Sequence, residues 1–466
     1  MDRRKFLRGS AFISTGLILN PLDLFAQNKI KPNLSTSSAK NIIFMISDGM
    51  SSGTLAMANL YNNQLHGKNG NWINLYEKNK VKRALMDTAS ASSIITDSAA
   101  ASSAFGGGIR VKNGVLNIGP NGELHVPIWQ KFKKAGKRTG CVTTVTITHA
   151  TPAGFCVNSA SRNAEPEIAE KYAEIGIDVL LGGGDEFFNS SKREDKKDLY
   201  AIYKKKGYQI AKTKEELVKS KNNQSLLGVF NTGAIPYAID HKNLEKNKSI
   251  PTIAEMTKVA IDNLKGHQNG FVLQIEAGKV DWAAHANDVA GLINDQVAFD
   301  ETIKTVMDFA EKDGNTLVII TTDHGNANPG TIYGADANKN FESIINYKYT
   351  NEHILNEIHD DFNLQEIKDW IVETNGFSLT DEEAKHMLDF YKGLEKEEGL
   401  YNFKKLPFKF FSEIQKKHNS VGWISMDHSG DYVELAMYGP GSDLLKPFVK
   451  NTDLHQLMLQ ATNVNA

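Results

Sequence analysis

The stretch Asn41-Ile-Ile-Phe-Met-Ile-Ser-Asp-Gly-Met50 decides the fold of this chain. Its uninterrupted apolar residues are typical of a strand buried on both faces, and the strand ends on Asp48 beside a glycine. Similar runs, bounded by Gly or Asp and separated by helical patterns, occupy residues 139–148, 179–181, 271–275 and 317–322. This alternation predicts an α/β fold with a central, mostly parallel sheet and helices on both faces.

The composition is that of a large folded protein. With 466 residues, of which 41% are hydrophobic and 23% charged, the chain can bury a core as one large domain or two smaller ones. We expect one α/β domain over residues 27–466. The 53 basic and 55 acidic side chains give a formal charge of -2, so the chain lacks the positive field that nucleic-acid binding requires.

The first 26 residues have the order of a signal peptide. Arg3-Arg4-Lys5-Phe6-Leu7-Arg8 precedes an apolar stretch, and Leu24-Phe25-Ala26 forms a suitable cleavage end. The paired arginines are typical of twin-arginine export, so we expect a periplasmic or secreted protein. A basic N-terminus on a cytosolic protein is the alternative. No later segment approaches the roughly 20 apolar residues of a membrane span, so none is predicted.

Two cysteines, Cys141 and Cys156, are too few for a dense disulfide framework. Both lie in apolar surroundings, where buried thiols are common. The sequence therefore favours two buried free thiols over a single disulfide bond.

Residues 330–418 differ from the flanking sequence because they are rich in Lys, Glu, Asn and aromatic residues. Thr380-Asp-Glu-Glu-Ala-Lys-His386 has the capping box and acidic first turn of a helix start. We interpret this segment as a helix-rich insertion near the active site. It is either a surface excursion or a cap that shapes the site entrance. After it, residues 431–437 alternate as a strand does.

Side chains that can bind metals follow several of the predicted strands. Asp48, Glu276 and the pair Asp323-His324 stand at strand ends, and Thr151 lies just beyond another. Ligands of open α/β sheets gather outside the carboxyl ends of the strands, so these residues are expected to meet. Taken singly, each has an ordinary alternative as a turn or capping residue.

Three further strings add a hydroxyl, an arginine and more ligands. Ser98, in Thr96-Asp-Ser-Ala-Ala, falls in the first turn of a predicted helix, where amide donors favour a bound phosphate; a plain helix cap is the alternative. Asp281 and His285 stand four apart and share one helix face, a spacing that lets both bind one metal. His428 lies in a glycine-bounded loop, and Arg162 offers a planar fork of donors to phosphate oxygens. Jointly the strings predict a polynuclear metal site that acts on an anion.

Taken in order, from about residue 40 to about residue 445, these strings resemble the alkaline phosphatase family. The resemblance implies two zinc ions and one magnesium ion. It places the first zinc on Asp281, His285 and His428, the second on Asp48, Asp323 and His324 with Ser98 completing it, and the magnesium on Asp48, Thr151 and Glu276.

The resemblance also implies an activity and its catalytic residues. Phosphate monoesters would be hydrolysed through a phosphoserine on Ser98, with Arg162 clamping two phosphate oxygens and Asp97 orienting it. His149 and Trp282 stand where some bacterial members carry Asp and Lys, which leaves the third metal, magnesium or zinc, and the hold on phosphate open. Trp282 either contacts phosphate or packs at the rim.

Three other functions remain as alternatives. The chain could be a phosphodiesterase or a sulfatase of the same superfamily, or a non-catalytic protein that binds metal or phosphate. Ser98 and Arg162 favour monoesters, because an arginine fork matches two unesterified oxygens whereas a diester offers fewer charges. Family members are often dimers, so the resemblance also implies a homodimer.

Overall fold

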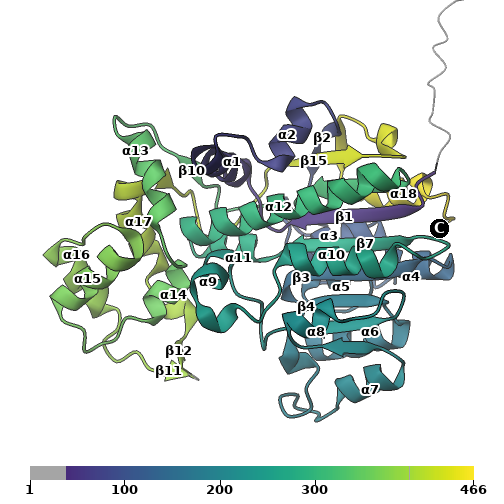
Figure 1. Cartoon of the computed structure of the whole chain (residues 1–466), viewed down its shortest axis with the longest axis horizontal. Helices are drawn as coiled ribbons and strands as arrows, with labels where there is room; N and C mark the ends of the chain where they lie inside the picture. Colours follow the sequence, from purple (N-terminus) through teal and green to yellow (C-terminus); the bar gives the residue numbers. More distant parts are fainter. Residues whose placement is uncertain (1–37, 398, 466) are drawn as a thin grey trace, which may run out of the picture. The chain divides into compact units, whose positions relative to one another are not determined.

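A ten-stranded sheet lies at the centre of the computed structural model, which describes residues 38–397 and 399–465 (Figure 1). The predicted signal peptide, residues 1–26, lies outside the described residues. The strands, in spatial order, are β16 (Phe448–Lys450), β2 (Lys82–Asp87), β15 (Val433–Tyr438), β8 (Thr316–Thr321), β1 (Asn41–Ser47), β7 (Phe271–Ala277), β3 (Arg138–Thr146), β4 (Val179–Gly183), β6 (Leu226–Val229) and β5 (Gln209–Ala211). β15 is antiparallel to both of its neighbours, and the other adjacent pairs are parallel. This confirms the predicted mostly parallel sheet.

Helices cover both faces of the sheet because its central strands are apolar on both sides. Ile43 and Met45 of β1 join one hydrophobic core, while Ile42 and Phe44 join the other. The first core is covered by α1 (Ser52–His66), α2 (Asn71–Glu77), α8 (Lys214–Val218), α9 (Ala238–Asn243), α10 (Ile253–Leu264), α11 (Lys279–His285) and α12 (Val289–Asp313). The second is covered by α3 (Ser98–Gly107), α4 (Ile128–Lys134), α5 (Ala150–Gly154), α6 (Glu165–Ile175), α7 (Leu199–Lys205) and α18 (Asp453–Ala461).

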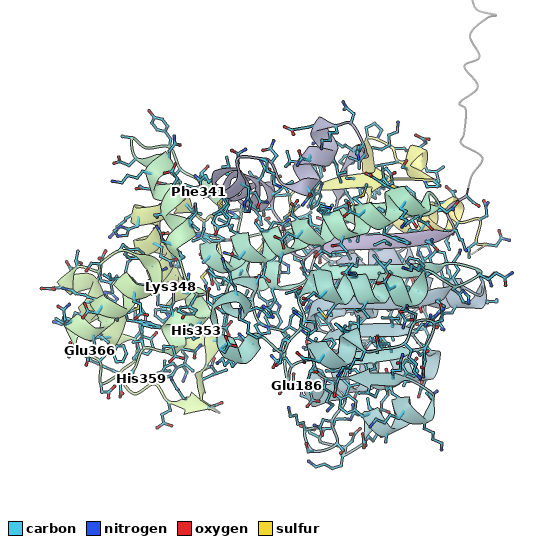
Figure 2. All side chains as sticks on the ribbon, in the orientation of Figure 1. Glu186, Phe341, Lys348, His353, His359 and Glu366 are labelled. Carbon is cyan, nitrogen blue, oxygen red and sulfur yellow. The ribbon has the colours of Figure 1, made fainter. Side chains whose placement is uncertain are left out.

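Residues 330–418 form a mainly helical segment beside the sheet, at the left of Figure 1. Its elements are β10 (Gly330–Thr331), α13 (Ala337–Glu342), η3 (Ser343–Asn346), α14 (Asn351–Asn356), α15 (Leu364–Asn375), α16 (Asp381–Asp389), β11 (Lys396–Glu397), β12 (Leu400–Tyr401), η4 (Phe403–Lys405) and α17 (Phe408–Asn419). Thr380 and Glu383 form the predicted capping box of α16. Phe341, labelled in Figure 2, packs in the first core, whereas α14 to α17 supply most of a third core that also contains Ala286.

Two smaller predictions concern the cysteines and membrane spans. Cys141 and Cys156 are both buried and free, which confirms the preference for thiols over a disulfide bond. Within the described residues, the structure contains no helix long and apolar enough to cross a membrane.

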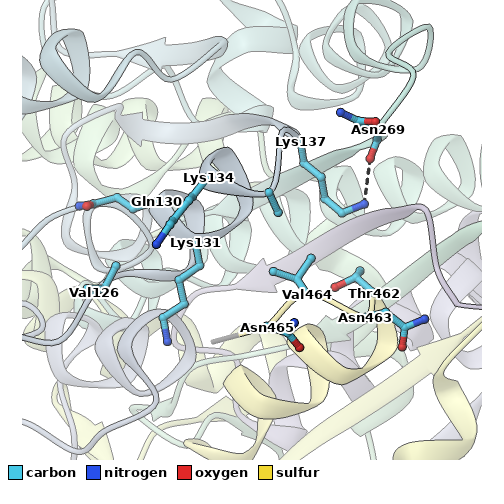
Figure 3. A pocket seen from close by; sticks show the side chains of 11 residues that line it. Val126, Gln130, Lys131, Lys134, Lys137, Asn269, Thr462, Asn463, Val464 and Asn465 are labelled. Carbon is cyan, nitrogen blue, oxygen red and sulfur yellow. Dashed lines mark hydrogen bonds between the residues drawn. The ribbon is translucent and has the colours of Figure 1, made fainter.

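A basic pocket lies at the amino ends of β3 and β7 (Figure 3). It has a volume of about 800 Å³ and is lined in part by Lys131, Lys134 and Lys137. Lys137 Nζ donates to the carbonyl oxygen of Asn269, 2.9 Å away. The predicted ligands follow the opposite, carboxyl ends of the strands, so this pocket is distinct from the candidate active site.

His455 on α18 supports the end of α3, and it predicts a pH dependence of stability. Lys131 Nζ donates to His455 Nε2 at 3.0 Å, so Nδ1 carries the hydrogen that it donates to the carbonyl oxygen of Phe105 at 3.2 Å. Burial, followed by the charge of Lys131, lowers the pKa of His455 to about 4. The unfolded chain therefore binds the proton more tightly, and stability is lost as the pH falls from about 6.5 towards 4.

We expect a His455→Gln variant to lose this part of the acid sensitivity. Between pH 7 and pH 5, the unfolding free energy of the unsubstituted chain should fall more steeply, by at most about 1.4 kcal/mol per pH unit. Urea unfolding of both proteins in a chelator, at several pH values, measures the difference. If the unfolding free energies of the two proteins fall equally steeply with decreasing pH, His455 does not cause this acid sensitivity.

Candidate metal centre and active site

The carboxyl ends of three adjacent strands bring the predicted carboxylates together. β8, β1 and β7 are neighbours and run parallel, with Ile46 of β1 paired to Thr321 of β8 and to Glu276 of β7. Asp48 follows β1 directly and Asp323 is the second residue after β8, so both reach the same edge as Glu276. Asp48, Glu276, Asp323 and His324 are all fully buried. The strand-end ligands therefore lie close together at one edge of the sheet, as the sequence predicted.

Three groups of side chains could each hold a metal ion, with ligand atoms within 4.8 Å of one another. The groups are Asp281, His285 and His428; Asp48, Asp323 and His324; and Asp48, His149 and Glu276. Asp48 belongs to two groups, as a carboxylate with two oxygens can. Thr151 also reaches the third group, because its Oγ1 donates to Asp48 Oδ2 at 3.3 Å. The imidazole of His149 is an additional potential ligand there.

The donors of these groups fit divalent cations. Asp48 Oδ1 and Asp323 Oδ2 are buried and accept no hydrogen bond within the described chain. Burial and then the charges of Asp323 and Asp281 raise the pKa of Asp48 well above its usual range, while burial raises the pKa of Asp323 to about 6. A buried carboxylate oxygen without a hydrogen-bond partner is costly, and a cation would supply the missing partner.

The imidazole of His324 is also in the form that a metal requires. Burial lowers its pKa to about 4, so the ring is neutral at neutral pH. His285 differs: burial lowers its pKa, but the hydrogen bond to Asp281, the charge of Asp281 and the bond to Met426 together raise the pKa of His285 to about 9. Its Nδ1 lies 2.6 Å from the carbonyl oxygen of Met426, which leaves Nε2 directed at Asp281 and His428. Such a hydrogen bond orients a ligating imidazole.

Ser98 is the first residue of α3, as the sequence predicted, and its Oγ lies 3.3 Å from His324 Nε2. Asp97 caps the helix: its Oδ1 accepts from the backbone N–H of Ala100 at 2.9 Å. The serine hydroxyl therefore stands at the positive end of a helix and beside the second ligand group.

Arg162 is held from two sides. Its Nη1 donates to Asp97 Oδ2 at 3.2 Å, and its Nη2 donates to His149 Nε2 at 3.0 Å. Arginine cannot accept, so His149 Nε2 must, and His149 Nδ1 therefore carries the hydrogen that it donates to Glu276 Oε1 at 2.9 Å. His149 thus links the third ligand group to the arginine. A quarter of the Arg162 side chain remains exposed and can reach an anion.

Trp282 lies outside the hydrogen-bond network of Arg162 and His149. It packs against the first hydrophobic core, with Lys279 Nζ 4.6 Å from its ring. This placement agrees with the packing alternative; a contact between Trp282 and phosphate stays a prediction.

Two supporting residues escaped sequence reasoning. Asn326 Nδ2 donates to Asp281 Oδ1 at 2.7 Å, and Thr143 Oγ1 donates to Glu276 Oε2 at 2.7 Å. Asn326 lies two residues beyond His324, directly after Gly325, and this nearness to the predicted ligand pair is the signal that could have identified it. Gly49 is equally constrained: its φ is +65°, and a Cβ would collide with the carboxylate of Asp281.

Buried carboxylates that need cations, a serine at a helix start and an oriented, accessible arginine define a metal-dependent hydrolase of the α/β class that acts on an anion. The family model described as alkaline phosphatase matches residues 39–464, and the chain belongs to the alkaline phosphatase family.

Individual relatives agree with this assignment. The chain is 32% identical to alkaline phosphatase 4 of Bacillus subtilis, over 89% of this chain and 87% of that protein. It is 30% identical to alkaline phosphatase 3 of the same organism, over 94% and 92%. The crystal structure of Thermus thermophilus alkaline phosphatase superposes with a TM-score of 0.85 at 33% identity, covering 92% of this chain and 93% of that one. The chain is therefore a phosphatase, and its family and fold support hydrolysis of phosphate monoesters at a metal site.

Proposed function

We propose that the chain hydrolyses phosphate monoesters through a covalent phosphoserine on Ser98. The observation that carries this proposal is the place of Ser98 Oγ, at the start of α3 and 3.3 Å from His324 Nε2, in a site that also holds Arg162. Ser98 Oγ forms a bond to phosphorus while the bond from phosphorus to the ester oxygen breaks. The alcohol leaves with that oxygen and takes up a proton, which balances the proton lost from the Ser98 hydroxyl. The oxygen of a water molecule then bonds to phosphorus while the bond from phosphorus to Ser98 Oγ breaks, and a proton of that water returns to Ser98 Oγ as inorganic phosphate is released.

We propose two zinc ions and one magnesium ion as the metals. Asp281, His285 and His428 would hold the first zinc, and Asp48, Asp323 and His324 the second. Asp48, Thr151 and Glu276 would hold the third ion. Zinc is the alternative, in which His149 Nδ1 would give up its hydrogen bond to Glu276 and bind the ion. When bound, such cations offset charge on phosphoryl oxygens and lower the pKa of adjacent hydroxyls and water. Metal analysis with an anomalous scattering map tests the count and identity; fewer than two zinc ions would reject this assignment.

The residues of the chain itself position the phosphate. The N–H groups and dipole of α3 favour the anion beside Ser98. Asp97 and His149 hold the guanidinium of Arg162, whose fork can contact two phosphate oxygens. A diester offers only two unesterified oxygens and a single charge, so this arrangement favours monoesters over diesters. Parallel assays with a monoester, a diester and a sulfate ester test this choice, and a diester rate above the monoester rate would overturn it.

Replacing Arg162 with alanine is expected to lower kcat/KM for monoesters on the order of 100-fold, because the two charge-assisted hydrogen bonds to phosphate are lost. Inhibition by inorganic phosphate should weaken as well. The kcat/KM of Arg162→Lys should lie between those of the unsubstituted chain and Arg162→Ala, since lysine keeps the charge but not the fork. Arg83→Ala, which removes an exposed arginine paired with Glu434, is the control. An unchanged inhibition constant for phosphate in Arg162→Ala would remove this residue from substrate binding.

We further propose export through the twin-arginine route, to the periplasm or the outside. The support is the order of Arg3-Arg4, the apolar stretch and Ala26 in the sequence. In the full chain, Arg3→Lys with Arg4→Lys should leave the activity in the cytoplasmic fraction; undiminished export would reject the proposal.

We also propose that the chain forms a homodimer, on the strength of family membership alone. Light scattering of the purified protein should give about twice the mass of one processed chain. A monomer mass across the working concentration range would rule the dimer out.

A further inference from the structure

A pocket of about 820 Å³ adjoins the candidate active site on the side of the insertion. The core domain contributes His285, Met426 and Asp427 to its lining. The rest comes from the insertion, mainly from η4 and the start of α17 and from Phe390 just after α16. The pocket therefore shares His285 with the first ligand group.

Three neighbouring histidine rings lie between Ser98 and the pocket. Ser98 Oγ is 3.3 Å from His324 Nε2, and the rings of His324 and His428 stack with centroids 3.8 Å apart. His428 Nε2 is in turn 3.1 Å from His285 Nε2. In an in-line displacement, the leaving oxygen departs opposite to the attacking oxygen. If the phosphate lies along this row, an alcohol that leaves away from Ser98 departs on the side of His285 and of the pocket that His285 lines.

The far wall of the pocket is aromatic and firmly held. Leu406 and Phe408 are buried in the third core, which also contains Ala286, the residue after His285. Phe403 packs on Phe408 with ring centroids 4.5 Å apart. Phe403 and Phe390 are each 40% exposed, so their rings are free to contact a ligand. The wall therefore offers aromatic surface at a fixed place relative to His285.

The pocket also carries excess positive charge. Lys404, Lys405 and Lys409 line it, and none of them forms an ion pair with the part of the chain that the structure describes. Of the two acids in the lining, Glu413 is paired with Lys416 at 3.4 Å, which leaves Asp427. Three unpaired lysines against one carboxylate favour a negatively charged ligand.

We propose that this pocket binds the alcohol part of the substrate and selects alcohols that carry an aromatic ring and, on it, a second anionic group. The proposal rests on the proposed phosphate monoester hydrolysis at Ser98 and names its substrate class. The ring contacts Phe403 and Phe390, and the anionic group lies near Lys404 and Lys405. These four side chains determine specificity and take no part in the chemistry.

Four phosphate esters of primary alcohols test the proposal, because their leaving groups differ little in acidity. They are the esters of propanol, of phenylpropanol, and of phenylpropanol with a para carboxylate or a para carboxamide. We expect kcat/KM to rise about tenfold from propyl to phenylpropyl phosphate. The carboxylate should exceed the carboxamide about threefold, and this advantage should shrink in high salt.

Substitutions in the pocket should remove each preference separately. Lys404→Ala with Lys405→Ala should remove most of the carboxylate advantage, because only Lys409 remains, and should leave propyl phosphate hydrolysis unchanged. Phe403→Ser should reduce the ring advantage, and Phe390→Ser provides a second reading if that variant does not fold. The matched control is Lys339→Ala with Lys385→Ala, which removes two exposed lysines elsewhere in the insertion.

Each outcome decides between the two proposals. Equal kcat/KM for all four esters, or an equal loss of the carboxylate advantage in the control, would overturn the pocket proposal while hydrolysis of propyl phosphate upholds the proposed function. If the protein hydrolyses none of the four esters, both the pocket proposal and the proposed function are overturned.

Discussion

Replacing Ser98 with alanine is expected to lower phosphate release from monoesters by at least about a thousandfold, because the proposed nucleophile is lost and water alone must attack. The helix should persist, since its cap is the side chain of Asp97 and not that of Ser98. Metal content should also persist, because the carboxylate and imidazole ligands are untouched. Steady-state assays with metal analysis on the same preparations measure both effects.

Ser102→Ala is the matched control for this substitution. Ser102 lies one turn further along α3 and is equally buried, but its Oγ donates to the carbonyl oxygen of Ala150 at 2.8 Å and not to the histidine group. The Ser102→Ala variant should keep its activity at temperatures where the variant is folded. Acid quenching during turnover should trap phosphate on the unsubstituted chain and none on Ser98→Ala. Unchanged activity in Ser98→Ala would remove Ser98 from the mechanism.

Replacing Asp48 with asparagine is expected to abolish activity and, in metal-free protein, to raise stability. Asp48 belongs to two ligand groups, so its loss weakens two metal sites at once. Without cations, the buried carboxylates of Asp48, Asp323 and Glu276 repel one another, and this repulsion adds to burial in raising the pKa of Asp48. An amide in place of Asp48 relieves both costs.

Melting curves with and without chelator separate these effects. Chelation should lower the Tm of the unsubstituted chain, because bound metal stabilises only the folded state. In chelator, Asp48→Asn should melt above the unsubstituted chain; with metal, it should melt below. Asp308→Asn, at an exposed carboxylate paired with Lys304, should change neither curve. A metal-free Asp48→Asn protein that melts below the metal-free parent would contradict the repulsion argument.

The central strands were predictable because their apolar runs admit few other environments. The predicted strand at residues 41–47 coincides with β1, and the run at residues 271–275 forms most of β7. The edge strands β5 and β16 and the inner strands β2 and β6 were not predicted; β6 has only four residues. β5 and β16 have only three residues each, and β2 exposes Lys82 and Arg83, so none has the continuous apolar run of a buried strand.

The sequence by itself determined which residue types stand at strand ends and helix starts. Asp48 ends β1 and Ser98 begins α3 because apolar runs and small helix-forming residues around them specify those elements locally. It also indicated that Asp281 and His285 share a helix face, since a spacing of four residues sets that within one helix.

Only the tertiary structure decided which of these residues meet. Ser98 and His324 are 226 positions apart, and the 3.3 Å between them depends on strand order, register and the packing of α3. The tertiary structure also decided the bond between His149 and Arg162, which are 13 positions apart but lie in no common helix or strand, and the aromatic wall that the insertion places beyond His285. Local sequence specifies local backbone conformation, whereas contacts across hundreds of residues are specified only when the whole core packs.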